Sequence, residues 1–284
     1  MKYLKQSSIH IILILGAVTM VLPFFWMVIT SFKTIGEVIS STSWVPNQIN
    51  LDNYIEAWEI VPFPRYFFNT AIIVSAVLVG VLITSALAAY AFSRMEFRGR
   101  DFIFMAFLAT MMIPEPVYLV PAYLILSSLP NPDYLIGLSQ KQNWIDTYYA
   151  LTIPWMANVF SIFLLRQHFK TIPQDLFDAA TIDGSSRLGI LWRIVAPLSK
   201  PALVTVALFS IIGSWNSFMW PLVVTNSEDM RPIQVGLAFF AQEQGTDYHL
   251  MMAAATFCTL PLLILYFFAQ KQIIQSFARS GLKD

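Results

Sequence analysis

The chain has 284 residues, of which 57% are hydrophobic and only 12% are charged. This composition lies far outside the range of soluble globular proteins and favours an integral membrane protein. The formal net charge of zero does not argue against that class, because membrane proteins segregate charge by side of the bilayer. The single cysteine, Cys258, excludes an internal disulfide.

The apolar residues gather in six stretches, each near the length of about 20 residues that a membrane-spanning helix needs. The first is too long for a signal peptide and lacks an A-x-A cleavage site, so it is interpreted as a membrane helix. The fourth is short and contains Pro154, which neighbouring helices can tolerate. The predicted fold class is all-α, a polytopic membrane protein with a single transmembrane domain over residues 1–284. The six predicted helices cover residues 9–31, 68–92, 102–125, 148–165, 202–224 and 250–270.

Basic residues are distributed unevenly between the segments that join these helices. With the N-terminus placed in the cytoplasm, the even number of helices puts both termini there, and 13 basic residues lie on that side against 4 outside. The positive-inside rule therefore predicts cytoplasmic termini. The 13 residues are Lys2, Lys5, Arg94, Arg98, Arg100, Arg166, Lys170, Arg187, Arg193, Lys200, Lys271, Arg279 and Lys283, and the 4 are Lys33, Arg65, Lys141 and Arg231.

A polar loop, residues 166–201, joins the fourth and fifth stretches. Each of its charges would cost several kcal/mol inside a bilayer, so the loop must lie in water, and the charge distribution places it in the cytoplasm. Thr171 and Gln174 have the spacing of a capping box and predict the start of a helix. Gly184 predicts its end in a left-handed conformation, and Ser185 or Ser186 can cap a second short helix.

The first of these short helices needs something to hold it. A helix of about 10 residues is marginal in isolation, and Leu176 and Phe177 are large apolar groups on a loop without a core of its own. One interpretation is contact with a partner protein. The other is a hairpin on the lipid headgroups, with Arg187 and Arg193 facing anionic lipid. The residues alone leave both interpretations open.

A motif in this loop resembles the EAA loop of ATP-binding-cassette (ABC) importer permeases. Asp178-Ala179-Ala180, three residues, Gly184, nine residues, Ile194, one residue and Ala196-Pro197 are similar to the family's Glu-Ala-Ala, three, Gly, nine, Ile-x-Leu-Pro. Asp178 keeps the charge of Glu with a shorter reach, and Ala196 replaces Leu. Further segments similar to the carbohydrate-type permeases, and most to the smaller subunit of the maltose and glycerol-3-phosphate group, are Thr30-Ser31-Phe32-Lys33, Tyr90-Ala91-Phe92-Ser93-Arg94, Met112-Ile113-Pro114, Phe163-Leu164-Leu165-Arg166-Gln167, Gly213-Ser214-Trp215-Asn216 and Trp220-Pro221-Leu222.

This resemblance implies the type I importer permease fold and an ATP-driven, binding-protein-dependent import of a sugar, an oligosaccharide or a related polyol. It implies a bacterial-type plasma (inner) membrane, a second homologous permease subunit, two cytoplasmic ATPase subunits and an external binding protein, and no nucleic acid. ATP and Mg would be bound by the ATPase subunits, with no cofactor in this chain. The first helix of the loop would be the coupling helix that seats on an ATPase and links its closure to alternating access. Its docking residues would be Leu176, Phe177, Asp178, Ala179, Ala180, Asp183 and Gly184.

Glu115 is a carboxylate inside the third apolar stretch, flanked by Pro114 and Pro116, with Pro121 nearby. A buried carboxylate is costly in a membrane, and prolines break helices that line cavities, so Glu115 is a candidate for the transport pathway. The alternative is a kink near the membrane surface with a solvated Glu115.

Trp215 and Asn216 belong to an aromatic and amide-rich patch in the fifth stretch. Aromatic faces beside hydrogen-bonding groups suit sugar rings, so both residues are pathway candidates. The alternative is an aromatic belt at the membrane interface.

Two other functions are weighed against this prediction. A stand-alone ion-coupled secondary transporter would carry several ionisable groups within the membrane and paired repeats, whereas this chain offers Glu115 and no visible repeat. An enzyme would need a catalytic arrangement, and the sequence shows no phosphate-binding loop, metal-ligand spacing or Ser/His/Asp pattern. We therefore predict a transport subunit without catalytic or metal-binding residues.

The segment 127–147 is longer than the family pattern and would alter how a binding protein sits.

Overall fold

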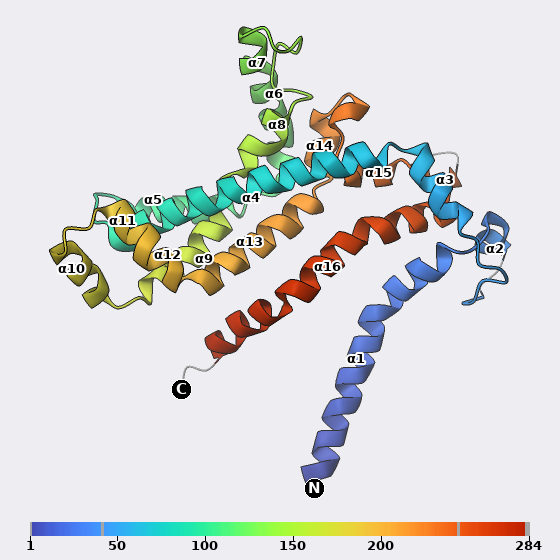
Figure 1. The fold of residues 1–284 in the computed structure, drawn as a ribbon, viewed down its shortest axis with the longest axis horizontal. Coiled ribbons are helices and arrows are strands. Elements are labelled where there is room, and N and C mark those ends of the chain that lie inside the picture. The colour runs from blue at the N-terminus through green and yellow to red at the C-terminus, as the bar shows by residue number, and fades with distance from the viewer. Residues whose placement is uncertain (1, 41–42, 243–244, 282–284) are drawn as a thin grey trace. The chain divides into compact units, whose positions relative to one another are not determined.

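The computed structural model describes the backbone of residues 2–40, 43–242 and 245–281 and the side chains of residues 9–40, 43–241 and 247–270 (Figure 1). The all-α prediction is confirmed within these residues. The exception is a two-residue antiparallel pair, β1 (Ala241–Gln242) with β2 (Gly245–Thr246), in which Ala241 is opposite Thr246. Of the basic residues counted above, the side chains of Lys2, Lys5, Lys271, Arg279 and Lys283 lie outside the described set.

The chain divides into two compact units, which are described separately. The first contains Met1–Pro64 and Val235–Ile264. In it, the buried Asn53 amide donates to the carbonyl oxygens of Ser31 and Lys33, both at 2.8 Å. The ammonium of Lys33, also buried, lies 4.5 Å above the Trp26 ring. The helices that lie in this unit or begin in it are α1 (Lys2–Thr30), α2 (Ile35–Ser40), α3 (Asp52–Ile60) and α16 (Tyr248–Gly281), while α15 (Ile233–Ala238) crosses the boundary and so do the first two residues of α4 (Phe63–Arg94).

The second unit, Arg65–Gln234 and Leu265–Asp284, holds the largest hydrophobic core. Apolar side chains of α4, α9 and α13 meet there, among them Val81, Leu165 and Val206, which are fully or almost fully buried. Its elements are α4 (Phe63–Arg94), α5 (Arg100–Thr110), α6 (Glu115–Ser128), α7 (Pro132–Leu135), α8 (Tyr148–Thr152), η1 (Ile153–Trp155), α9 (Val159–Lys170), α10 (Gln174–Ile182), α11 (Arg187–Ile190), η2 (Leu191–Val195), α12 (Ala196–Leu198), α13 (Lys200–Trp215), α14 (Met219–Val224) and η3 (Glu228–Met230).

Among the described residues, four helical stretches are long and apolar enough to span a membrane: Ile9–Thr30, Phe63–Arg94, Tyr148–Lys170 and Tyr248–Gln270. The number rises to six only if each of two bent helix pairs forms one span.

The predicted stretch 102–125 contains a sharp break near the prolines that the sequence analysis singled out. There α5 and α6 meet at an angle of 101°. The break lies at Pro114, whose backbone is extended. Proline cannot donate the backbone hydrogen bond that would continue α5, and its ring disfavours a helical conformation in the residue before it. The predicted helix 202–224 is interrupted as well, since α13 ends at Trp215 and α14 begins at Met219. The single domain expected over residues 1–284 stays a prediction.

Asp146 joins the segment 127–147 to the end of α14 in the second unit. Its carboxylate accepts hydrogen bonds from the backbone of Asn226 at 2.9 Å and of Ser227 at 3.0 Å, and it pairs with the Lys141 ammonium at 2.7 Å. Burial would raise the pKa of Asp146, but these donors outweigh it and hold the pKa below its ordinary value. The ionised carboxylate therefore fixes one end of this segment.

Candidate functional site

The helix α10 ends as the sequence predicts. Gly184 has a φ of 75°, in the left-handed region, and its N–H donates to Thr181 at 3.0 Å while the N–H of Ser185 donates to Ala180 at 2.9 Å. These two bonds form the Schellman motif that satisfies the last carbonyl groups of a helix. Ser186 then caps α11 by accepting a hydrogen bond from the N–H of Gly189 at 3.1 Å, which confirms the predicted cap.

The predicted capping box at the start of α10 is wrong. The Thr171 hydroxyl donates to the carbonyl of His168 at 2.7 Å and so belongs to the end of α9. Pro173 occupies the position before α10 with an extended backbone. The side chain of Gln174 donates to Asp178 at 2.9 Å and accepts from Arg94. The long-range hydrogen bond from Arg94 thus takes the place of the local capping-box bond to the backbone of Thr171.

The seven predicted docking residues divide between two faces of α10. Phe177 and Ala180 are only 6% and 5% exposed and belong to the core of the second unit. The expectation that Phe177 is an exposed apolar group is therefore wrong, because its position three residues before Ala180 puts both on the inward face. The exposed members are Leu176, Asp178, Ala179, Asp183 and Gly184.

Ile182 is an exposed apolar residue that the sequence interpretation missed. It is the last residue of α10 and is 86% exposed, compared with 41% for Leu176. Figure 1 shows α10 at one extremity of the second unit, next to α11. Leu188, on α11, is exposed as well. The sequence does carry a signal for this surface, since the apolar Ile182 stands directly before the polar turn Asp183-Gly184.

Arg94, the last residue of α4, holds α10 in place. One guanidinium nitrogen donates to the carbonyl oxygens of Phe169 and Ile172, and another donates to Gln174 at 2.9 Å. The guanidinium also lies 4.1 Å from the centre of the Phe177 ring. A single side chain thus connects the end of α4 with the end of α9 and both the start and the buried face of α10. Arginine suits this position because its planar fork can donate in several directions while it stacks on an aromatic ring.

Arg166 makes a similar connection between α9, α4 and α5. It is buried and donates to the carbonyl oxygen of Phe92 at 3.1 Å and to the carboxylate of Asp101 at 3.2 Å. It also lies 3.9 Å from the centre of the Phe104 ring. The sequence analysis counted Arg94 and Arg166 among the cytoplasmic basic residues and found both in segments similar to the carbohydrate-type permeases, but it gave them no structural role. Their partners are distant in sequence, and no local pattern announces them.

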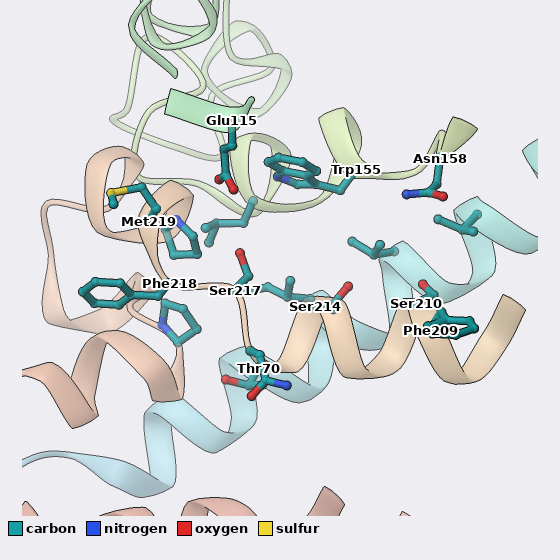
Figure 2. A pocket seen from close by; sticks show the side chains of 18 of the residues that line it. Thr70, Glu115, Trp155, Asn158, Phe209, Ser210, Ser214, Ser217, Phe218 and Met219 are labelled. Carbon is teal, nitrogen blue, oxygen red and sulfur yellow. The ribbon is translucent and has the colours of Figure 1, made fainter. Parts of the chain in front are cut away.

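A cavity of about 600 Å³ opens among the membrane helices of the second unit. Figure 2 shows the Glu115 carboxylate pointing into this space, with the hydroxyls of Ser214 and Ser217 approaching from the opposite side. The lining combines aromatic faces with hydroxyl and amide groups. It consists of Thr70, Ile73, Val77, Val81, Glu115, Leu151, Trp155, Asn158, Phe160, Ser161, Phe209, Ser210, Gly213, Ser214, Asn216, Ser217, Phe218, Met219, Pro221 and Pro232.

The structure brings two of the three pathway candidates to this cavity. Glu115 lies half-buried at the first turn of α6, and Asn216 follows the end of α13. Trp215 is buried, packs edge-on against Phe67 at 6.1 Å between ring centroids and is not part of the lining. Adjacent residues at a helix end point in different directions, so Asn216 and Trp215 cannot share one face.

Two buried polar atoms of the lining residues have no hydrogen-bond partner among the described residues. They are the indole nitrogen of Trp155 and the hydroxyl of Ser210. Buried polar groups are normally paired, and both of these atoms are enclosed by protein, so they would reach water or a ligand only after a side-chain rotation. The described part of the chain contains no cluster of three His, Cys, Asp or Glu side chains that could hold a metal ion. The cavity is therefore suited to hydrogen bonding and aromatic contact.

A family model described as "Binding-protein-dependent transport system inner membrane component" matches residues 80–279. The chain belongs to this family. Its permease character is supported by relatives that extend over nearly all of its length. The trehalose/maltose transport system permease protein of Thermococcus litoralis is 36% identical over 283 residues, which cover 96% of this chain and 97% of the relative. The diacetylchitobiose uptake system permease protein of Streptomyces coelicolor is 31% identical over 269 residues, covering 94% and 85%.

The permease fold is shared with a solved bacterial ABC transporter involved in the import of the acidic polysaccharide alginate. The TM-score is 0.79 at 24% sequence identity, over 95% of this chain and 96% of the other. The predicted ABC importer permease fold is thereby confirmed. The chain is an inner membrane transport subunit of a binding-protein-dependent ABC transporter and not an enzyme.

Proposed function

We propose that this permease is one of two transmembrane subunits of an ATP-driven importer for a sugar, an oligosaccharide or a related polyol. The observation that carries this proposal is the pair of saccharide permeases that align with at least 94% of the chain. The cavity adds chemical support. Sugar rings pack their C–H faces on aromatic side chains while their hydroxyls need hydrogen-bond partners, and Trp155, Phe209 and Ser210 offer both.

In this proposal α10 is the coupling helix. Its exposed surface, with Leu176, Asp178, Ala179, Ile182 and Asp183, would seat on a cytoplasmic ATPase subunit that binds ATP and Mg. Movement of α10 would reach the membrane helices through the buried face of α10 and through the contacts that Arg94, at the end of α4, makes with Gln174 and Phe177. Two ATPase subunits, a second homologous permease and an external binding protein complete the assembly, and both termini of this chain lie in the cytoplasm. Alternating access follows from two arrangements of these rigid elements.

An ion-coupled secondary transporter is the alternative. Such a protein usually places several ionisable side chains near the middle of the membrane. The lining of the described cavity contains a single ionisable residue, Glu115. This observation favours coupling to ATP hydrolysis.

Reconstitution tests the proposed function. The permease, its partner permease, the ATPase and the binding protein of the same gene neighbourhood are combined in proteoliposomes that contain ATP on the ATPase side. We expect accumulation of a labelled saccharide that requires all four proteins and ATP. The control is the permease alone in vesicles with a proton or sodium gradient. Accumulation in that control would contradict the proposal and support the secondary transporter.

A further inference from the structure

The cavity lining contains very few side chains that can carry a charge. Among its 20 lining residues, Glu115 is the one that ionises, and no lysine, arginine or histidine is present. The nearest basic residue in sequence is Arg231, beside the lining residue Pro232, and its side chain is hydrogen bonded to Tyr66. The wall therefore presents one negative charge and no positive one.

We propose that Glu115 makes this cavity a charge-selective saccharide subsite, which accepts neutral and amine-bearing sugars and rejects uronates and sugar phosphates. This inference rests on the proposed function and names its substrate class. It concerns a question that the fold leaves open, since the solved neighbour is described as importing an acidic polysaccharide.

The polar groups of the wall complement an uncharged sugar. The Glu115 carboxylate accepts hydrogen bonds, and the lining hydroxyls of Ser214 and Ser217 can both donate and accept. A sugar hydroxyl can donate to Glu115 and pair with these serines, while Phe209 and Phe218 offer apolar faces. An ammonium group on the sugar would pair directly with Glu115. Figure 2 labels both Glu115 and Trp155 among the residues that line the cavity.

An anionic sugar meets the opposite situation. A ligand carboxylate or phosphate in this space would face the Glu115 charge without a basic partner in the lining. Charge repulsion near protein is stronger than in bulk water, because the effective dielectric constant is lower there. Part of the specificity therefore comes from rejection of the wrong ligand and not only from attraction of the right one.

Equilibrium binding to the purified complex of both permeases and the ATPase tests this inference, with the binding protein omitted so that its own selectivity does not intervene. The probes are three disaccharides of similar size: neutral maltose, deacetylated chitobiose with two amines, and the dianion digalacturonate. We expect the wild-type complex to bind chitobiose and maltose more tightly than digalacturonate. In Glu115→Gln the ratio of maltose affinity to digalacturonate affinity should fall by about tenfold or more, because the repelling charge is gone.

Glu96→Gln is the matched control, since Glu96 is an exposed carboxylate outside this cavity and its removal changes the net charge equally. Retained maltose binding shows that the Glu115→Gln complex is folded. An unchanged affinity ratio in Glu115→Gln, or an equal change in Glu96→Gln, would overturn the subsite. Either result leaves the proposed importer intact if the complete transporter still accumulates a neutral sugar, whereas loss of all saccharide uptake in the wild type would overturn the importer itself.

Discussion

Replacing Arg94 with alanine is expected to separate ATP hydrolysis from saccharide uptake. The substitution removes the donors that serve the carbonyl groups of Phe169 and Ile172 and the stacking partner of Phe177. Hydrogen bonds from a charged group contribute about 1.5–3 kcal/mol each, so the seat of α10 on the membrane helices should weaken by a comparable amount. In the reconstituted importer we expect the number of sugars transported per ATP hydrolysed to fall by about tenfold, a change that about 1.4 kcal/mol produces.

Two further variants make this result specific. Arg98 is exposed in the turn after α4, and Arg98→Ala should leave the transport ratio at its wild-type value. Arg94→Lys should recover only part of the coupling, because an ammonium cannot reproduce the fork that contacts several groups. If Arg94→Ala transports with the wild-type ratio, Arg94 is a structural residue and does not position the coupling helix.

Replacing Gly184 with valine is expected to detach the ATPase from the membrane subunits. A Cβ atom at this position would meet nothing within 4 Å, so the cost comes from the left-handed backbone alone. Such a conformation costs a non-glycine residue about 1–3 kcal/mol, and a β-branched residue lies at the upper end. Relief of this strain would alter the last turn of α10, which carries Ile182 and Asp183. We expect loss of ATPase co-purification and of uptake, while the amount of permease in the membrane is unchanged.

Gly137 provides a control with the same strain. Its φ is 76° and a Cβ atom there would also meet nothing within 4 Å, but it lies in the segment 127–147, on the opposite side of the membrane in the proposed topology. Gly137→Val should therefore retain the ATPase. Retention of the ATPase by Gly184→Val, or its loss in both variants, would show that the turn at Gly184 has no particular role in attachment.

The sequence predicted those parts of the fold that depend on neighbouring residues. The end of α10 at Gly184 and the cap at Ser186 are local structures, set by the backbone preference of glycine and the short reach of a serine hydroxyl. The burial of Phe177 was not predicted, because the core that covers it is formed by distant parts of the chain, and Arg94, which stacks on its ring, is 83 positions earlier. Prolines identified the interruption near residue 114, but the 101° angle between α5 and α6 depends on tertiary contacts.

The cavity was predicted only in part, because some of its features are visible in the local sequence and others depend on tertiary contacts. A carboxylate in an apolar stretch is conspicuous in any sequence, and Glu115 does line the cavity. Trp155 and Ser210 are ordinary residues of apolar stretches, and only the tertiary arrangement of η1 and α13 places both in the lining with their polar atoms unpaired.

Cross-linking from Ile182 measures the central claim, that α10 contacts the ATPase. Ile182 is 86% exposed, and the one natural cysteine, Cys258, is buried, so a cysteine introduced at 182 would be the reactive thiol for a short bifunctional reagent. Ile136, which is 68% exposed at the end of α7, is the control position. The proposal predicts a cross-link between Ile182→Cys and the ATPase in the assembled transporter, with a yield that changes when ATP binds, and none from Ile136→Cys. A transporter that imports sugar normally but gives no cross-link from Ile182→Cys would contradict it.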